Sequence, residues 1–349
     1  MTTRVYSDLI QFRGTHYDFG FFQGQKLQNS PILAHRKKQW GSKSMRERHF
    51  IVNEGKYRSV METFAPRIIE EIEGLADALE MNYEDAIREF GGYYLEYGKS
   101  GCSIFTGKNY MIRNYDNSPD SYEGRYVFYQ PVDGGYATTG PSMQITGRTD
   151  GMNEKGLSLG YNFINRKKSD DGFVCNMIGR IVLENCSNIE EAIQLLKEIP
   201  HRHSFTYALL DQSGQPVAVE ASPRVVEVRE ANYCTNHFEV LTEENRYRMD
   251  DSIRRYKAIE ANKDSVSSPY DAYRMMNEIE SGVFSTKYGA WAGTLHTAMY
   301  LPKEMKVGIS LGGNRLPLMM DFEKWLKGER FNAVRIKGEL ESKESFINV

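Results

Sequence analysis

The sequence predicts an α+β fold in which antiparallel sheets are covered by helices. Three observations carry this prediction: mainly helical periodicity before Ser100, many short β-type runs after it, and helices that interrupt those runs in groups. Strands joined by hairpins and combined with grouped helices are typical of antiparallel sheets packed against helices. No repeat, low-complexity tract or flexible linker divides the 349 residues. We therefore expect one globular unit.

The first hundred residues are expected to be mostly helical. Apolar residues recur with a helical period from Val60 to Leu79 and form one stripe that a core would bury. Pro66, inside this stretch, either starts the helix or kinks it. Asn82 and the acidic residues after it suit the start of a short helix through Ala86.

The strands are expected in sequence after Ser100. The runs CSIFTG and NYMIRNY form a hairpin that turns at Gly107-Lys108. The later β-type runs are RYVFYQPV, SMQITG, GLSLGYNFI, TYALLD, PVAVEA, RVVEVRE, GTLHTAMYL and MKVGISL. Helices are predicted at about Asn176–Glu184, from Ser187 with Glu190 completing a capping box, and from Ser252 to Ala261.

Cys102 is the candidate nucleophile, at the point where the helical part ends and the first strand begins. Gly101 gives the preceding peptide the conformational freedom that a strained scissile bond needs. Arg113 and Asp116 follow in the paired strand, where buried charges are costly unless they are paired or used. The three remaining cysteines are interpreted as small buried hydrophobes, and no pair has zinc or redox spacing: Cys175, Cys186 and Cys234.

Three motifs together resemble the cysteine-type N-terminal nucleophile (Ntn) hydrolases: Gly101-Cys102-Ser103, Arg113-Asn114-Tyr115-Asp116, and the string Asp150–Phe163. Within that string, MNEKGL…NF resembles the choloylglycine hydrolases. The segment from Gly14 to Gly24, and the length of chain before the cysteine, resemble the precursor arm of the acyl-coenzyme A:6-aminopenicillanic acid acyltransferase family, peptidase family C45. The resemblance runs from about residue 10 to 330. It implies an αββα four-layer sandwich, with two antiparallel sheets face to face and helices outside.

The resemblance also implies two segments and a self-processing step. Residues 1–101 would be a mostly helical precursor segment and residues 102–349 the nucleophile segment. Cleavage between Gly101 and Cys102 would free an α-amine, whose reference pKa is about 7.7–8.0, beside a thiol of reference pKa about 8.5. That amine can serve as the base, so no histidine is required. The implied activity is that of an amidohydrolase or acyltransferase, which acts on the linear C–N amide bond of a small N-acyl compound through a thioester.

Individual roles follow from the same resemblance. Arg113 would lie near the thiolate and lower the pKa of the thiol, while Asp116 would hold and orient the Cys102 amine. Asn162, through its backbone N–H, and Asn236, through its side chain, would form the oxyanion hole.

A distal arginine in Ser-Ile-Arg-Arg-Tyr would stabilise the site; Arg255 is the candidate, and Arg254 beside it stays an alternative. The alternative interpretations without a catalytic role are that Asn236 caps a turn and that Arg255 lies on a solvated helix face. Asn153 is expected to support a hairpin turn.

Three rival interpretations remain. A papain-like site would pair the cysteine with His237 or His296, but the local signature of that family is absent. A metal site at His201 and His203 has no identifiable third ligand. The third alternative is a degenerate, unprocessed Ntn-fold protein that binds a small ligand without turnover.

Bulk properties exclude other classes. The formal net charge of −3 and the lack of a long basic run argue against a nucleic-acid partner. No stretch approaches about 18 apolar residues, and MTTRVYSDLIQF lacks the apolar region of a secretion signal, so we expect no membrane partner and a cytoplasmic location. We expect no cofactor and no metal. The expected partner is a small N-acyl substrate, with an acyl-coenzyme A donor as a candidate. The acyl group, the amine, hydrolysis versus transfer, and the oligomeric state stay open.

Overall fold

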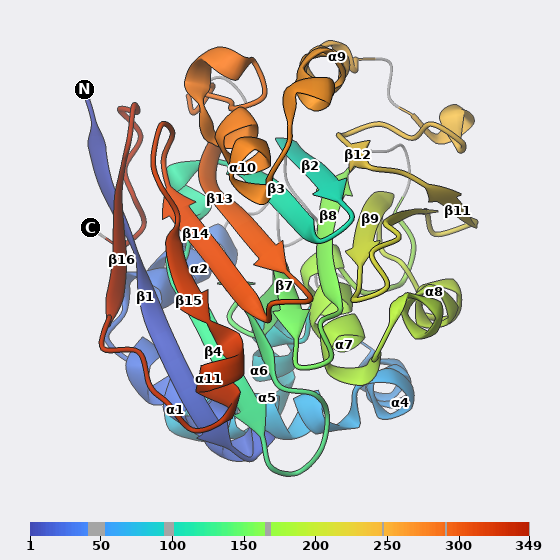
Figure 1. Cartoon of the computed structure of the whole chain (residues 1–349). Coiled ribbons are helices and arrows are strands. Elements are labelled where there is room, and N and C mark those ends of the chain that lie inside the picture. The colour runs from blue at the N-terminus through green and yellow to red at the C-terminus, as the bar shows by residue number, and fades with distance from the viewer. Residues whose placement is uncertain (41–52, 94–100, 165–168, 246–247, 290–291, 349) are drawn as a thin grey trace.

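A computed structural model describes residues 1–40, 53–93, 101–164, 169–245, 248–289 and 292–348. Two sheets face each other in its centre (Figure 1). The larger sheet has the strand order β11-β10-β9-β8-β7-β5-β4-β1-β16, with β6 paired to β5. Its strands are β1 (Thr3–Gly14), β4 (Arg125–Pro131), β5 (Thr138–Met143), β6 (Gly147–Arg148), β7 (Asp150–Asn153), β8 (Ser158–Phe163), β9 (Phe205–Leu210), β10 (Val217–Ala221), β11 (Val226–Glu230) and β16 (Arg335–Leu340).

The smaller sheet has the order β12-β2-β3-β13-β14-β15. Its strands are β12 (Tyr233–Cys234), β2 (Gly101–Gly107), β3 (Tyr110–Asn117), β13 (Gly293–Leu301), β14 (Lys306–Leu311) and β15 (Leu318–Asp321). Strand β2 packs across the interface against β8 of the larger sheet. The two central strands that carry the candidate site motifs therefore lie where the sheets meet.

Helices cover the outer faces of both sheets. They are α1 (His16–Leu27), α2 (Pro31–Trp40), α4 (Glu54–Phe64), α5 (Pro66–Leu79), α6 (Tyr83–Phe90), α7 (Cys175–Asn185), α8 (Ile189–Glu198), α9 (Asp250–Asn262), α10 (Pro269–Asn277) and α11 (Phe322–Leu326). Helices α7 and α8 pack on the larger sheet, and α9 and α10 pack on the smaller one. This is the predicted αββα sandwich. No helix of the described residues combines the length and apolarity needed to cross a membrane.

The segment before Cys102 is mostly helical, as predicted, but it also contains a strand that was not expected from the sequence. It begins with the long strand β1, which lies between β4 and β16. Its pairing with β4 is parallel, so the larger sheet is mixed rather than wholly antiparallel. The partners of β1 begin at residues 125 and 335, so only contacts distant in sequence define this strand.

Local signals set most element boundaries. Pro66 starts α5 at its first turn and separates it from α4, so the predicted single helix is two. Helix α8 is capped by Asn188, which accepts from the Glu191 N–H, rather than by Ser187 with Glu190. The run SMQITG is no single strand, because β5 ends at Met143 and a tight turn follows.

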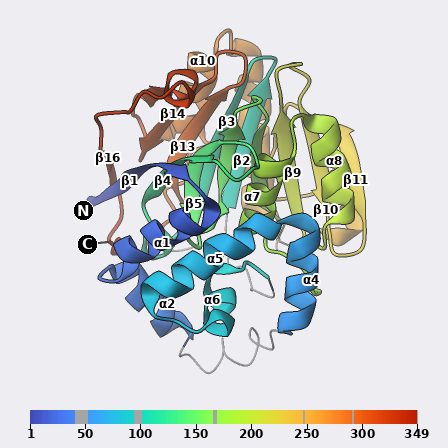
Figure 2. The ribbon, with the colours of Figure 1, turned by 90° about the horizontal axis from the view of Figure 1, so that it is seen from below.

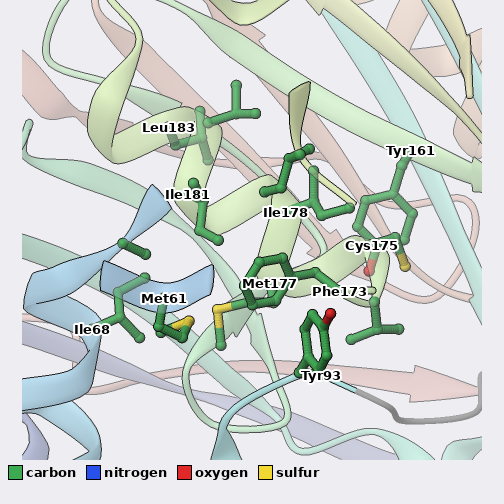
Figure 3. Packing of buried hydrophobic residues seen from close by; sticks show 14 of the residues in the cluster. Met61, Ile68, Tyr93, Tyr161, Phe173, Cys175, Met177, Ile178, Ile181 and Leu183 are labelled. Carbon is green, nitrogen blue, oxygen red and sulfur yellow. The ribbon is translucent and has the colours of Figure 1, made fainter. Parts of the chain in front are cut away.

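The helices before Cys102 share a core with the rest of the chain. Figure 3 shows Met61 and Ile68, from α4 and α5, beside Met177 and Ile181 of α7. Figure 2 shows α1, α2, α4, α5 and α6 together below the larger sheet. The described part of the segment 1–101 is thus packed into the molecule both by β1, which pairs with β4 and β16, and by a layer of helices.

Candidate active site

Cys102 lies near the start of β2, opposite Tyr115 of β3. The residue is 1% exposed. The Arg113 side chain donates from Nη2 to Cys102 Sγ at 3.3 Å. A cation beside a thiol favours the thiolate, which is the nucleophilic form.

Arg113 connects the two sheets. From β3 of the smaller sheet it reaches Asp150 of β7 through Nη1 at 2.6 Å and the Tyr161 carbonyl of β8 through Nη2 at 2.7 Å. Its guanidinium lies 5.0 Å from the ring centre of Tyr115 and 4.9 Å from that of Tyr161. Burial alone would lower the pKa of Arg113, but the neighbouring Cys102 and Asp150 outweigh it and raise that pKa. The guanidinium is therefore a fixed positive charge next to the sulfur.

Asp150 belongs to this group, although the sequence reasoning did not single it out as a site residue. It accepts hydrogen bonds from the Tyr300 hydroxyl at 2.5 Å and from Thr149 Oγ1 at 2.7 Å, and His296 Nε2 lies 3.3 Å away. Burial would raise the pKa of Asp150, but Arg113 and His296 hold it well below its usual range. The only signal in the sequence was its place at the head of the Asp150–Phe163 string.

Arg255 of α9 binds the main chain at Cys102. Its Nη1 donates to the Cys102 carbonyl at 2.5 Å and to Ser103 Oγ at 2.7 Å, and its Nε donates to Asp251 at 2.9 Å. The neighbouring Arg254 points to the surface, where it donates to the Gly282 carbonyl. The structure therefore places Arg255, and not Arg254, at the candidate site.

Asp116 lies beside the bond expected to break. Its Oδ1 accepts from Thr294 Oγ1 at 2.7 Å, and its Oδ2 is 4.0 Å from Arg255 Nη1. A Cβ on Gly101 would come within 3.1 Å of Asp116 Oδ2, which favours glycine at that position. Burial raises the pKa of Asp116 to about 6, against the opposing effects of Arg255 and Thr294.

Asn236 holds the backbone nitrogen of Cys102. Its Oδ1 accepts from the Cys102 N–H at 2.8 Å and from Arg255 Nη2 at 2.7 Å, while its Nδ2 donates to the Phe163 carbonyl at 2.7 Å. In this continuous chain, the side chain expected to donate to an oxyanion thus accepts from the scissile nitrogen. It binds across the interface rather than capping a turn.

Asn162 sits one residue from the Tyr161 carbonyl that accepts from Arg113. Its Nδ2 donates to the Thr235 carbonyl at 3.1 Å and lies 3.3 Å from Cys234 Sγ. The structure therefore brings Cys102, Arg113, Asp116, Asn236 and Arg255 into one set of direct contacts. Asn162 joins this set only through the neighbouring segment at Thr235.

The residues of the rival interpretations have other partners. His296 faces Asp150, and His237 Nδ1 lies 2.9 Å from Ser252 Oγ. His201 contacts the Leu196 carbonyl at 2.8 Å. Across the described ranges no group of three His, Cys, Asp or Glu side chains is placed to hold a metal ion. Asn153 supports the β7–β8 turn as expected, accepting from the Lys155 and Leu157 N–H groups.

Two facing sheets between helical layers, with Cys102 and Arg113 at their interface, form an αββα sandwich that holds a candidate nucleophile between its sheets. The family model of acyl-coenzyme A:6-aminopenicillanic acid acyl-transferase matches residues 105–316, more than half of the chain. The chain therefore belongs to this family of enzymes. The match begins just after Cys102 and contains Arg113, Asp116, Asn162, Asn236 and Arg255.

Several solved structures are similar. A penicillin V acylase from Agrobacterium tumefaciens is 16% identical, with a TM-score of 0.45 over 64% of this chain and 86% of that one. A conjugated bile acid hydrolase from Clostridium perfringens is 15% identical, with a TM-score of 0.44 over 70% and 98%. An N-acylethanolamine-hydrolyzing acid amidase ortholog from Caenorhabditis elegans is 13% identical, with a TM-score of 0.38 over 58% and 92%. No curated protein sequence matches the chain.

Proposed function

We propose that the chain cleaves itself between Gly101 and Cys102, and that the released Cys102 then transfers an acyl group from a small N-acyl compound. The observation that carries this proposal is the 3.3 Å contact between Arg113 Nη2 and Cys102 Sγ, with both residues buried. It supports a sulfur that is kept reactive rather than merely packed. The family of the chain, whose members act in acyl transfer, supports the same conclusion.

The first step is an acyl shift from nitrogen to sulfur. The Cys102 thiol attacks the Gly101 carbonyl carbon, the C–N bond breaks, and the nitrogen takes up a proton as it becomes an amine. Gly101 is then held as a thioester on Cys102 until water releases it as a carboxylate and restores the thiol. Three contacts support this step, because they fix the sulfur, the nitrogen and the carbonyl of Cys102: those from Arg113, Asn236 and Arg255.

Asp116 is placed to bind the α-amine of Cys102 that cleavage would create. It lies against Gly101, so a positive nitrogen formed at this junction would meet a carboxylate within the same buried space. A carboxyl with a pKa of about 6 can also exchange a proton near neutral pH. We propose that Asp116 orients the amine, and that the amine acts as the base for each later attack by the thiol.

Turnover then repeats this chemistry on an added substrate. The thiolate attacks the amide carbonyl, the C–N bond breaks, and the leaving amine takes the proton that the Cys102 amine has received. Water or a second amine then accepts the acyl group from the thioester. We propose Asn162 and Asn236 as oxyanion donors; Asn236 would donate through Nδ2, the atom that now donates to the Phe163 carbonyl. Donors of this kind typically contribute about 2.7–4 kcal/mol.

We further propose that residues 1–101 and 102–349 stay together after cleavage as one globular unit. The support is the pairing of β1 with both β4 and β16 in the larger sheet and the shared core around α7. No disulfide links the four cysteines, all of which lie in the described residues, and we propose a reducing, cytoplasmic setting. Small N-acyl compounds are the proposed substrates, with an acyl-coenzyme A as a possible donor of the acyl group.

The test combines intact mass with turnover. Wild-type protein should separate on denaturing gels into two fragments that end at Gly101 and begin at Cys102, and Cys102→Ala should remain one folded chain. Cys102→Ser should cleave slowly at best, because an alcohol is a weaker nucleophile than a thiolate. Free-amine release is then measured on N-acyl amino acids, penicillins, conjugated bile salts and β-alanyl amines.

The degenerate alternative predicts a different result from the same samples. It is supported by the burial of Cys102 in the continuous chain, where a substrate cannot reach the sulfur. A wild-type chain that stays intact and releases no amine would favour it. Cleavage of the Cys102→Ala variant at the same bond would contradict self-processing by this residue.

A further inference from the structure

A cleft lies at the β1–β16 end of the larger sheet, away from β7 and β8 of the candidate active site. We propose that the cleft between β1, α1 and the segment 330–337 binds a small organic molecule carrying two or more phosphate groups. The cleft has a volume of about 610 Å³, within the range of small-molecule sites. It lies beside β1 and β16, at the left of Figure 1, whereas β2 and β3 of the candidate active site lie to the right of it.

The lining of this cleft is strongly cationic. Its charged residues are Lys26, Arg125, Arg330, Arg335 and Lys337 against Asp8 alone. The Asp8 carboxylate is already paired within the cleft, because Arg335 Nε donates to Asp8 Oδ1 at 2.7 Å. Such a concentration of positive charge is local, since the whole chain has a formal net charge of −3.

Three of these cations lack a carboxylate partner. Within the described part of the chain, Lys26, Arg330 and Lys337 take part in no ion pair. The Lys26 ammonium lies 5.0 Å from the ring centre of Phe22, at the wall of the cleft. Their mutual repulsion is relieved when an anion enters between them.

Arg125 adds a buried positive charge to this cleft. It is 5% exposed, and its Nη2 donates to Gln23 Oε1 at 2.8 Å. Its Nη1 is buried and has no hydrogen-bond partner in the structure. Burial lowers the pKa of Arg125, although Glu123, Glu71 and Asp8 oppose that effect. An anion in the cleft would favour the charged guanidinium, which its surroundings now disfavour.

The cationic surface continues into a second cleft of about 370 Å³. This cleft shares Arg335 and Lys337 with the first and adds Arg4 and Arg315. Glu339 is its one acid, 3.8 Å from Arg315 Nη2. Cations therefore extend over two adjoining cavities, so a single phosphate would leave most of them unpaired. This favours a ligand with several phosphate groups.

Apolar walls favour an organic ligand over an inorganic one. Phe22, Leu27 and Ile32 line the cleft together with the cations. These residues come from α1 and α2, while Arg330 and Lys337 come from the last part of the chain. A ligand in this cleft would therefore contact both the segment before Cys102 and the segment that follows it.

The proposal is tested on the full chain by calorimetric titration with ADP, pyrophosphate and inorganic phosphate. ADP and pyrophosphate should bind, with inorganic phosphate at least tenfold weaker, and binding should weaken severalfold between 50 and 200 mM salt because charge dominates it. The double variant Lys26→Ala/Lys337→Ala should lose at least tenfold in ADP affinity. The matched control Lys257→Ala/Lys303→Ala removes the same charge from exposed positions elsewhere and should bind like the wild type.

Other outcomes overturn the proposal. These are equal ADP affinity in the cleft and control variants, no binding of ADP or pyrophosphate, or inorganic phosphate binding as tightly as ADP. A membrane arm distinguishes the source of the phosphate groups. Sedimentation with vesicles containing phosphatidylinositol bisphosphate, combined with no ADP binding, would replace the soluble ligand by a lipid headgroup. None of these measurements depends on cleavage at Cys102.

Discussion

Arg255 donates a hydrogen bond to the Cys102 carbonyl oxygen across a separation of 153 residues. The same guanidinium reaches Asn236, whose Oδ1 accepts from the Cys102 N–H. One side chain of α9 therefore helps to fix both backbone groups of the candidate nucleophile. The backbone at Cys102 depends on a helix that forms far downstream.

The two adjacent arginines of α9 provide a matched pair of variants. Arg255→Ala leaves the buried Asp116 without its nearest cation and breaks the hydrogen bonds to the Cys102 carbonyl and to Asn236, so we expect it to block cleavage and to lower the free energy of unfolding by about 3–5 kcal/mol. Arg254→Ala removes a surface contact and should change stability by less than about 0.5 kcal/mol. Urea unfolding and denaturing gels measure both effects. Equal effects of the two substitutions would contradict the placement.

Asp116 should make the uncut chain less stable as pH rises. Burial raises its pKa from 3.8 to about 6, so the stability it contributes is full below pH 4 and is lost as pH rises through 6. Each tenfold change in proton affinity is about 1.4 kcal/mol, which makes the loss roughly 3 kcal/mol. In a Cys102→Ala background, Asp116→Asn should remove this loss between pH 4 and 7.5, as measured by urea unfolding. The control substitution Asp264→Asn, at an exposed position, should leave this loss of stability with rising pH unchanged.

Asp150→Asn should disable the site without touching the sulfur. The variant leaves Arg113 buried without its carboxylate, which we expect to cost about 3–5 kcal/mol of stability and to slow cleavage by more than tenfold. The wild-type carboxyl has a pKa well below its usual range, so its stabilising effect is present above the unfolded value near 4 and is lost as pH falls below that. Unfolding at pH 7 and rates of fragment formation test this. Normal cleavage in this variant would remove the role of Asp150.

Cleaved protein should elute as a single species under native conditions. The two segments are joined by buried side-chain pairs as well as by β1, since Arg180 of α7 lies 2.8 Å from Glu71 of α5 and Glu184 of α7 lies 3.4 Å from His16 of α1. Glu71→Ala should lower the free energy of unfolding by about 3–5 kcal/mol, because Arg180 keeps its charge in the interior. The matched control is Glu70→Ala, because Glu70 lies on the same helix and is exposed. Separation of the fragments on a native column would contradict one globular unit.

The sequence predicts the parts of the fold that local signals control. The hairpin at Gly107-Lys108, the cap at Asn82 and the break at Pro66 all depend on neighbouring residues, and the structure confirms them. Strand β1 escaped prediction because both of its partners are remote in sequence. Its buried residues alternate only from Val5 to Leu9. This run is too short to be recognised as a strand in a segment whose other residues have a helical period.

The residues of the candidate site also fall into those that local sequence predicts and those that only the three-dimensional structure reveals. Motif spacing on one hairpin placed Arg113 and Asp116 near Cys102, and the structure brings the three together. The choice between Arg254 and Arg255 needed the rotation of α9, which sequence alone does not fix. Asp150 was missed because its importance comes from its contact across the two sheets.

The pairing of β1 with β16 brings the two ends of the chain side by side, since Thr3 lies opposite Leu340 and its Oγ1 donates to the Ser342 carbonyl. A short linker could therefore join these ends, and a rearranged gene could begin at Cys102 behind an initiator methionine. Removal of that methionine by the host would expose the cysteine without any internal cut. Such a circular permutant would separate the need for a free amine from the need for self-cleavage, two requirements that the natural chain order binds together.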